Sequence, residues 1–152
     1  MKNEPDDFYS LTEPQPGIVY NEKEPTCISL HKCVSGVIDG LQSNITANSN
    51  SIANDVFPKL IVSTDKQTLI SVLESLLHIV ITNSQNNSIY VSAKVIGSIT
   101  LIHIRSSNAE YNDSIGNGMQ KIEQMAESIG GCLTISNNKM HGLTLAFTFI
   151  NR

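Results

Sequence analysis

The sequence has no tryptophan and is poor in aromatic and charged residues. Aromatic side chains make up 5% of the 152 residues and charged ones 16%, while 40% are apolar. No apolar run approaches the ~18 residues that a membrane-spanning helix requires. The first ten residues, MKNEPDDFYS, lack an apolar stretch, which excludes a secretory signal peptide. The length and composition predict one globular domain.

Clusters of basic residues are also absent. The formal net charge is −4, and it comes from residues 1–26, where six acidic residues face only Lys2 and Lys23. The remaining residues carry eight charges of each sign. Because nucleic-acid binding needs clustered lysine and arginine, this balance argues against it. Residues 1–26 also hold four of the five prolines, so we expect a lead-in or linker there and a domain over 27–152.

Cysteines are few. Cys27, Cys33 and Cys132 form no CxxC pair and are odd in number, which indicates neither a zinc site nor a disulfide framework. A reduced, cytoplasmic setting follows as the expectation. We interpret the three cysteines as small apolar packing residues.

What the sequence does have is strong hydrophobic periodicity. Helical spacing predicts a first helix from Ser29 to about Ile45 and a second over 66–82 capped by Thr64 or Asp65. A third is predicted over 118–128, where Gly130 and Gly131 prevent its continuation. Residues 106–115 are predicted to form a loop. The predicted strands cover 51–57, 59–63, 88–96, 99–105, 132–136 and 143–150. Together they predict an α+β fold, a two-layer sandwich in which a mixed sheet of five or six strands carries three helices on one face.

Four segments stand out in order along the chain. They are Asn21–Val34 (NEKEPTCISLHKCV), Thr64–Ser84 (TDKQTLISVLESLLHIVITNS), Gly116–Met119 (GNGM) and His141–Phe147 (HGLTLAF). They resemble, respectively, the entry to the domain, the N box, the G2 box and the terminal strand of the ATP-binding domain of sensor histidine kinases. These kinases belong to the wider GHKL ATPase family, which has the Bergerat fold. The resemblance runs from Asn21 to the end of the chain.

The resemblance implies ATP and Mg²⁺ as cofactors. In this family an N-box asparagine holds the magnesium, and a carboxylate at the start of the G1 loop accepts a hydrogen bond from adenine. Glycines let the backbone approach the nucleotide, and a mobile lid closes over the phosphates. Carried over by resemblance, the nucleotide-cleft positions are Ser75, Ile79, Asn83, Ser106, Asn108, Gly116, Gly118, Met119 and Thr144.

Several of these positions carry the wrong chemistry. Ile79 occupies the metal-ligand position, and a hydrocarbon cannot ligate a cation that prefers oxygen. Ser106 replaces the carboxylate, and Asn108 and Glu110 replace glycines. Together these changes should weaken the binding free energy for Mg-ATP by about 3–5 kcal/mol, or roughly two to three decades of affinity. The sequence therefore predicts a degenerate domain with no metal ligands, with weak or no ATP binding and without catalysis.

Four further features are weaker candidates. Glu74 beside the N box could act as a general base, although a solvated glutamate is the commoner interpretation. His78 could contact a ligand, although a partly buried histidine without a catalytic role is the favoured interpretation. His31 lacks the acid and proline that follow the family's phospho-acceptor histidine, so an acceptor is expected upstream instead. Gly116–Met119 could cradle a phosphate at the start of the third helix, or simply form the turn into it.

These expectations make the chain the C-terminal ATPase-like domain of a two-component sensor histidine kinase, cut from a longer protein, with a regulatory or scaffold role. The implied partners are its own upstream dimerising and phospho-acceptor helices and a response regulator, with no nucleic acid and no direct membrane contact. The expected location is cytoplasmic, alone or as the cytosolic part of a membrane-anchored protein. Two alternatives remain: an active kinase domain with a variant nucleotide site, and a stand-alone phosphotransfer or anti-sigma-like binding protein.

Overall fold

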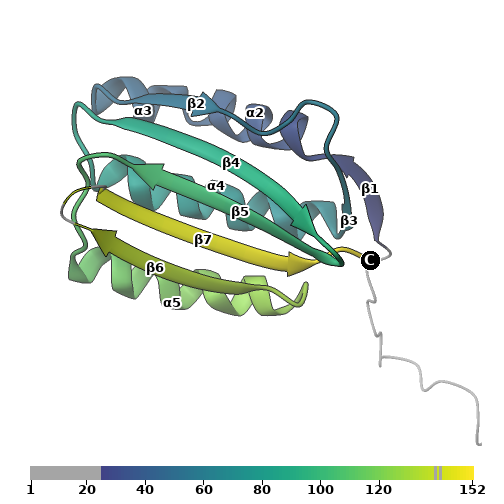
Figure 1. The fold of residues 1–152 in the computed structure, drawn as a ribbon. Helices are drawn as coiled ribbons and strands as arrows, with labels where there is room; N and C mark the ends of the chain where they lie inside the picture. The colour runs from purple at the N-terminus through teal and green to yellow at the C-terminus, as the bar shows by residue number, and fades with distance from the viewer. Residues whose placement is uncertain (1–24, 139, 141) are drawn as a thin grey trace, which may run out of the picture.

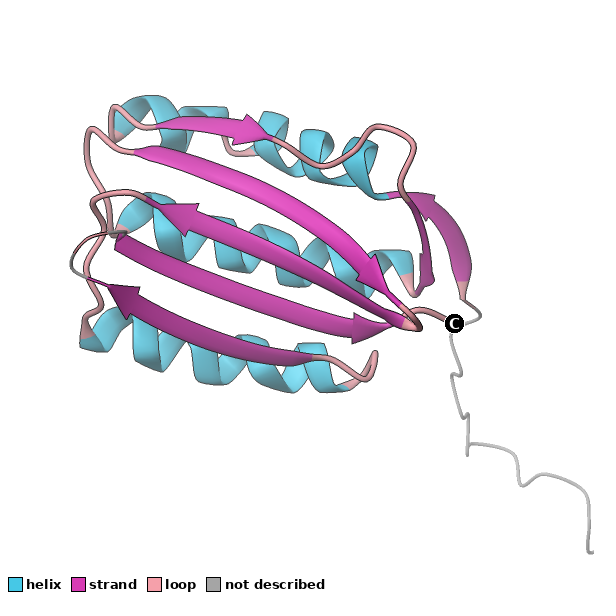
Figure 2. Cartoon of the chain, viewed as in Figure 1, coloured by secondary structure: helices cyan, strands magenta, loops and turns pink. Residues whose placement is uncertain are grey.

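A five-stranded sheet lies against one layer of helices (Figure 1, Figure 2). The computed structural model describes residues 25–138, 140 and 142–152. The elements are β1 (Thr26–Ser29), α2 (Leu30–Gly40), α3 (Gln42–Ala47), β2 (Ser51–Asn54), β3 (Ile61–Thr64), α4 (Lys66–Thr82), β4 (Ser88–Ile96), β5 (Ile99–Ser106), α5 (Asp113–Glu127), β6 (Cys132–Asn138) and β7 (Gly142–Ile150). None of the described helices is both long enough and apolar enough to cross a membrane.

The main sheet has the strand order β2-β4-β5-β7-β6. The β2–β4 pair is parallel, and the other three pairs are antiparallel. Figure 1 shows all the helices behind this sheet, so that its other face is open. The predicted α+β two-layer fold with a mixed sheet and helices on one face is therefore confirmed.

Side chains alternate across the sheet, as the pleat requires. Every second residue of β7 is buried against the helices, and its Phe147 and Phe149 rings lie 5.3 Å apart. The strand β5 buries Ile102 and Ile104 in the same way. One face of the sheet thus forms half of the core, and the other meets solvent.

Helix α4 supplies much of the other half of the core. It spans the predicted residues 66–82, and the Asp65 carboxylate caps it by accepting a hydrogen bond of 3.2 Å from the Thr68 N–H. Its buried residues are Leu69, Val72, Leu73, Leu76, Leu77, Val80 and Ile81. In Figure 1 it lies between α2 and α5, which explains why its sequence is apolar on more than one side.

Two predicted helices differ from the structure. The first is interrupted at Leu41, so that α2 and α3 replace one continuous helix. Gly40 ends α2, consistent with the low helix propensity of glycine. The third helix begins at Asp113 rather than 118, because Asn112 provides an N-cap: its side chain accepts a hydrogen bond from the Ile115 N–H at 3.0 Å.

A small second sheet was not predicted. Strand β1 pairs with β3 in antiparallel register, with Thr26 opposite Thr64, so Thr26 belongs to the domain and not to the lead-in. The chain end holds this small sheet against the main one. Asn151 Oδ1 accepts from the Ser63 N–H at 2.7 Å, and the Arg152 N–H donates to the Ser63 carbonyl at 2.8 Å. The Asn151 N–H donates to the Ser98 carbonyl at 2.7 Å.

The remaining predicted strands match closely. Strand β4 spans the predicted residues, whereas β2 ends at Asn54, before the predicted end at 57. Lys139 and His141, between β6 and β7 in the sequence, lie outside the described residues, as do residues 1–24 of the predicted lead-in.

Candidate functional site

The structure brings part of the predicted nucleotide site together in a groove between α4 and α5. The groove has a volume of about 370 Å³. Its lining residues are Leu41, Glu74, Ser75, His78, Ile79, Gly118, Lys121, Ile122 and Met125. Ser75 and Ile79, which the resemblance places in the N box, lie one helical turn apart on α4 and line the groove with Gly118 of α5. Apolar side chains make up much of this lining.

Ile79 packs directly over Gly118. A β-carbon on Gly118 would lie 2.5 Å from Ile79 Cδ1 and 3.3 Å from Ile79 Cγ1. The isoleucine therefore occupies the space beside the glycine where the resemblance places a magnesium ligand. A hydrocarbon in this position offers no oxygen to a cation.

The Asn83 amide is engaged inside the protein. Its Nδ2 donates to the Ile79 carbonyl at 2.8 Å, and its Oδ1 accepts from Asn112 Nδ2 at 3.1 Å. The same Asn112 side chain caps α5 through the Ile115 N–H. Asn83 thus links the end of α4 to the start of α5, and both its donor and its acceptor have protein partners.

The G2-box segment lies inside α5 and not before it. The Gly116 N–H donates to the Asn112 carbonyl at 3.2 Å, so it is not free for a phosphate. The Tyr111 side chain lies over Gly116, and Met119 is buried in the core. The first turn of the helix instead carries Asp113, whose carboxylate disfavours an anion there. Residues 116–119 therefore form neither of the two alternatives considered for them, a phosphate cradle or a simple turn into the helix, because they lie within α5.

Ser106 and Asn108 belong to a polar cluster built around the buried side chain of Asn87; Ser106 is buried, whereas Asn108 is exposed. Ser106 is 0% exposed and accepts from Asn87 Nδ2 at 2.7 Å. Asn87 Oδ1 in turn accepts from Ser107 Oγ at 2.7 Å and from the Asn108 N–H at 3.1 Å. The position expected to carry the adenine-binding carboxylate is thus filled by a buried hydroxyl that already has a partner.

Thr144 does not lie near the predicted nucleotide-site residues that line the α4–α5 groove. Its neighbours Leu143 and Leu145 point into the core, so Thr144 lies on the open face of the sheet. There it lines a separate hollow with residues that include His103 and Arg105. Glu110 is exposed in the connection between β5 and α5.

Comparison with known proteins gives no matching family model and no match among curated proteins. Solved structures do match. The histidine kinase AdeS of Acinetobacter baumannii superposes with a TM-score of 0.73 at 13% identity, over 84% of this chain and 68% of that one. The nucleotide-free catalytic domain of histidine kinase ThkA gives 0.67 at 16%, over 84% and 96%. This chain has the fold of the histidine kinase catalytic domain.

Two further structures with this fold carry ligands or partners. Full-length ShkA, in complex with AMPPNP, matches with a TM-score of 0.72 at 14% identity, over 99% of this chain and 35% of that one. ThkA in complex with the response regulator TrrA gives 0.67 at 15%, over 99% and 49%. At these identities the likeness concerns the fold.

Within the histidine kinase fold, three residues that the sequence did not single out organise the site. Asn87 holds Ser106 and the chain after it, Asn112 caps α5 and binds Asn83, and Tyr111 covers Gly116. Asn87 lies in the polar stretch 83–87 that follows α4, where no local pattern marks it as a buried residue. Asn112 before Asp113 is an ordinary N-cap signal that the nearby glycines obscured.

The remaining candidate residues are either exposed or engaged in a structural hydrogen bond. Glu74 and His78 are exposed on α4, so His78 is less buried than predicted. His31 Nδ1 donates to the Val56 carbonyl at 2.8 Å and so holds α2 against the chain that follows β2. Across residues 25–138, 140 and 142–152, no three histidine, cysteine, aspartate or glutamate side chains gather in a way that could hold a metal ion.

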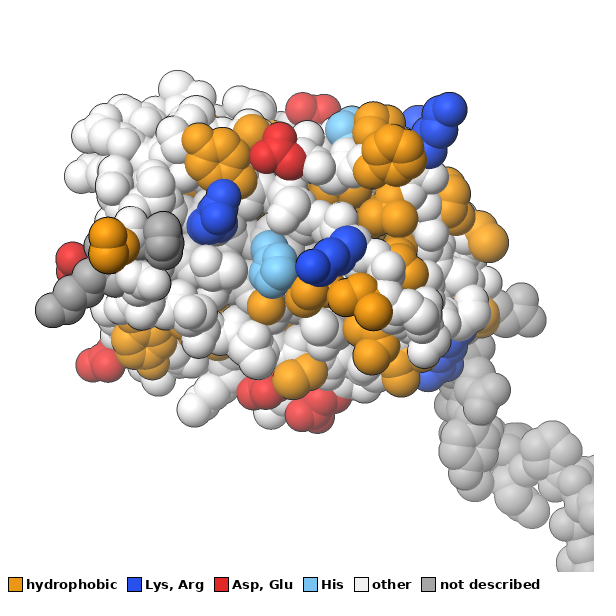
Figure 3. Space-filling model, viewed as in Figure 1, with side chains coloured by type: hydrophobic (Ala, Val, Ile, Leu, Met, Phe, Trp, Pro, Cys, Tyr) orange, Lys and Arg blue, Asp and Glu red, His pale blue; other side chains and the backbone are white. Residues whose placement is uncertain are grey.

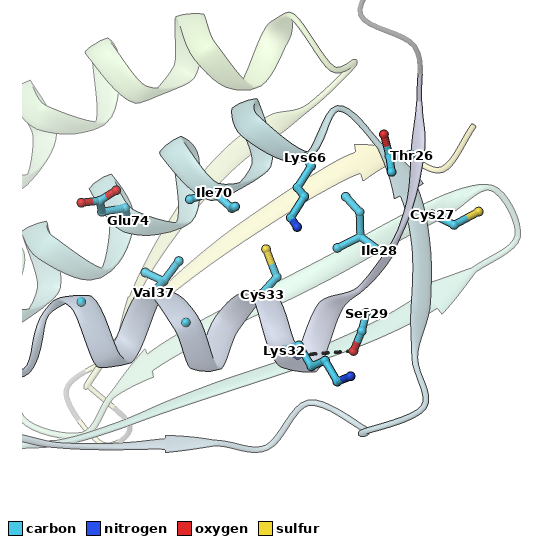
Figure 4. Close-up of a pocket in the computed structure, with 12 residues that line it drawn as sticks. Thr26, Cys27, Ile28, Ser29, Lys32, Cys33, Val37, Lys66, Ile70 and Glu74 are labelled. Carbon is cyan, nitrogen blue, oxygen red and sulfur yellow. Dashed lines mark hydrogen bonds between the residues drawn. The ribbon is translucent and has the colours of Figure 1, made fainter.

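A second hollow, of about 510 Å³, lies between β1, α2 and α4 (Figure 4). The Cys33 and Lys66 side chains point toward one another across it. Burial raises the pKa of the Cys33 thiol, and the Lys66 ammonium partly opposes this rise. Of the candidate site residues that the structure describes, Glu74 alone lines this hollow; it also lines the α4–α5 groove, so the two hollows adjoin at Glu74.

Proposed function

We propose that this chain is the ATPase-like domain of a two-component sensor histidine kinase, that it binds Mg-ATP weakly or not at all, and that it acts as a regulatory or scaffold module. The observation that carries the proposal is the contact between Ile79 and Gly118. It fills the expected metal position with hydrocarbon, in a chain that otherwise has the kinase fold.

The surrounding polar groups support the same conclusion. The Asn83 amide is held by the Ile79 carbonyl and by Asn112, and these contacts fix its oxygen toward Asn112. Ser106 has no charge with which to hold adenine, and its hydroxyl is buried against Asn87. Phosphoryl transfer depends on a metal ion that neutralises the developing charge, so a domain without that ion would not catalyse it.

The partners we propose follow from the fold. Upstream dimerising and phospho-acceptor helices would be the first surface available to such a domain, and a response regulator the second. The complex of ThkA with its response regulator supports the second, as a property of a protein with the same fold. The same assignment implies a cytoplasmic location, where response regulators are found.

Calorimetric titration of the full chain with Mg-ATP tests the proposal. We expect no saturable binding in the micromolar range for the natural sequence. The double variant Ile79→Asn, Ser106→Asp restores an amide oxygen and a carboxylate at the two altered positions, and we expect it to gain measurable binding. Micromolar binding by the natural sequence would contradict the proposal.

A matched control is available on the same helix. Ile70 is a partly buried isoleucine of α4 that lines the other hollow and not the α4–α5 groove. Ile70→Asn introduces the same polar group at a comparable cost in packing, and it should gain no nucleotide affinity. Thermal unfolding of each variant shows whether the domain remains folded.

A further inference from the structure

The open face of the sheet carries a hollow of about 260 Å³ that is unrelated to the α4–α5 groove. Its lining residues are Asp55, Tyr90, Ser92, His103, Arg105 and Thr144. Strand register brings most of them together, since Arg105 lies opposite both Tyr90 and Thr144, and Ser92 lies opposite His103. Figure 3 views this face and shows basic and histidine side chains near its middle.

Two opposite charges line this hollow without touching each other. The Asp55 backbone N–H donates to the Val91 carbonyl at 2.8 Å, which fixes Asp55 beside β4, whereas Arg105 lies on β5. Neither side chain forms a hydrogen bond or an ion pair with any residue that the structure describes. Two interstrand spacings and a register offset of two residues place their backbones about 12 Å apart, which leaves room for a small bridging molecule.

The two sides of the hollow suit different groups. A guanidinium with a neighbouring hydroxyl and imidazole, here Arg105, Thr144 and His103, is suited to a carboxylate. The opposite side offers the Asp55 carboxylate and the Tyr90 ring, which together suit an ammonium through charge and cation–π attraction. A simple anion would be repelled by Asp55, and a simple cation by Arg105.

We propose that this hollow binds a small zwitterion of the α-amino acid class, with its carboxylate at Arg105 and its ammonium at Asp55. The volume agrees with this class, because pockets for larger, drug-sized ligands begin at about 300 Å³. The surface position of the side chains suits weak, millimolar binding. The site lies on the opposite face of the sheet from the helices, so it does not depend on nucleotide binding.

Nuclear magnetic resonance of the isotopically labelled full chain tests the proposal with L-alanine as the probe. We expect saturable shifts of the backbone amides of Ser92, His103, Arg105 and Thr144. Acetate and methylamine each carry one half of the charge pattern, and each should bind at least tenfold more weakly than L-alanine, since each lacks one charged contact. Binding of acetate as tight as that of L-alanine would mean a plain anion site and would overturn the proposal.

Charge-matched variants distinguish specific binding in this hollow from a general effect of the net charge of the domain. Arg105→Ala and Asp55→Asn should each weaken L-alanine binding about tenfold or more. Lys94→Ala removes a positive charge from the same strand pair outside the hollow, and Asp39→Asn removes an exposed acid from α2; neither should change the affinity. Equal effects of the Arg105 and Lys94 variants, or no saturable shift with L-alanine at all, would overturn the assignment.

Discussion

Ile79 and Gly118 face each other across the α4–α5 contact, and the isoleucine Cδ1 occupies the space that a β-carbon on Gly118 would need. The glycine lies in the interior of α5, where alanine would favour the helix by about 1 kcal/mol. A methyl group at position 118 must therefore displace the tip of Ile79. The gain in helix propensity and the steric clash with Ile79 therefore oppose each other, and their difference can be measured as a change in the free energy of unfolding.

We predict that Gly118→Ala stabilises the domain by about 1 kcal/mol in an Ile79→Val background, where Cδ1 is absent. In the natural background the gain should be smaller by about 0.5–1 kcal/mol, the coupling expected of residues in contact. Urea denaturation of the four proteins in this double-mutant cycle measures both values. An equal effect of Gly118→Ala in both backgrounds would show that the two side chains do not compete for space.

Asn87 is predicted to be a major polar determinant of stability. Its buried amide serves the Ser106 hydroxyl, the Ser107 hydroxyl and the Asn108 N–H. Asn87→Ala should lower the free energy of unfolding by about 1–3 kcal/mol, because it leaves the buried Ser106 hydroxyl without its partner and removes the contacts that hold Ser107 and Asn108. Asn137 on β6 is exposed, so Asn137→Ala should change stability by less than ~0.5 kcal/mol in the same denaturation assay. Similar losses in the two variants would contradict the network.

Thr100 offers a prediction of the opposite sign. Its side chain is 0% exposed, and its hydroxyl has no hydrogen-bond partner in the described part of the chain. Thr100→Val keeps the shape and removes the unsatisfied group, so we expect a gain of about 1 kcal/mol. Thr134→Val on β6, where the side chain is exposed, controls for the general preference of strands for valine. A loss of stability at position 100 would show that the hydroxyl has a partner, such as a buried water.

Cys33 should give the protein an alkaline sensitivity. Burial raises the pKa of its thiol above the ordinary 9.0, so the folded protein binds this proton more tightly than the unfolded chain. Its contribution to stability is fully present below pH 9.0 and is lost as the pH rises toward the folded pKa. Urea denaturation on both sides of that pH measures the loss, which Cys33→Ala should reduce.

Thiol labelling provides the check on the same residue. Cys27 and Cys132 are exposed, whereas Cys33 is buried, so a thiol reagent should modify Cys33 last in the native state. All three should react alike in denaturant. A native rate for Cys33 equal to that of Cys27 would contradict its burial.

Elements with complete local signals could be predicted from the sequence. Helix α4 has an uninterrupted apolar stripe and an Asp65 cap, and its predicted bounds hold. The β4–β5 hairpin has alternating strands around Gly97, whose φ of +61° is one that glycine adopts readily. The identities of Ile79 and Ser106 are visible in the sequence, but the nucleotide-site roles of these positions remain a prediction from the resemblance.

Features that depend on distant partners could not be predicted. Strand β1 is stable only because β3, far along the chain, pairs with it. The face to which Thr144 points depends on sheet register, and a shift of one residue moves a side chain to the other face. The start of α5 was misplaced because Gly116 and Gly118 suggested a turn, whereas Asn112 caps the helix upstream of both.

The bonds made by Asn151 and Arg152 have a mechanical consequence. They join the β3 end of the small sheet to the turn between β4 and β5, so that β1 is anchored to the body of the protein rather than hinged on it. A torque applied at Pro25 would then rotate the domain as a rigid body instead of rotating β1 alone. The open face of the sheet, which carries His103 and Arg105, would rotate by the same angle as Pro25.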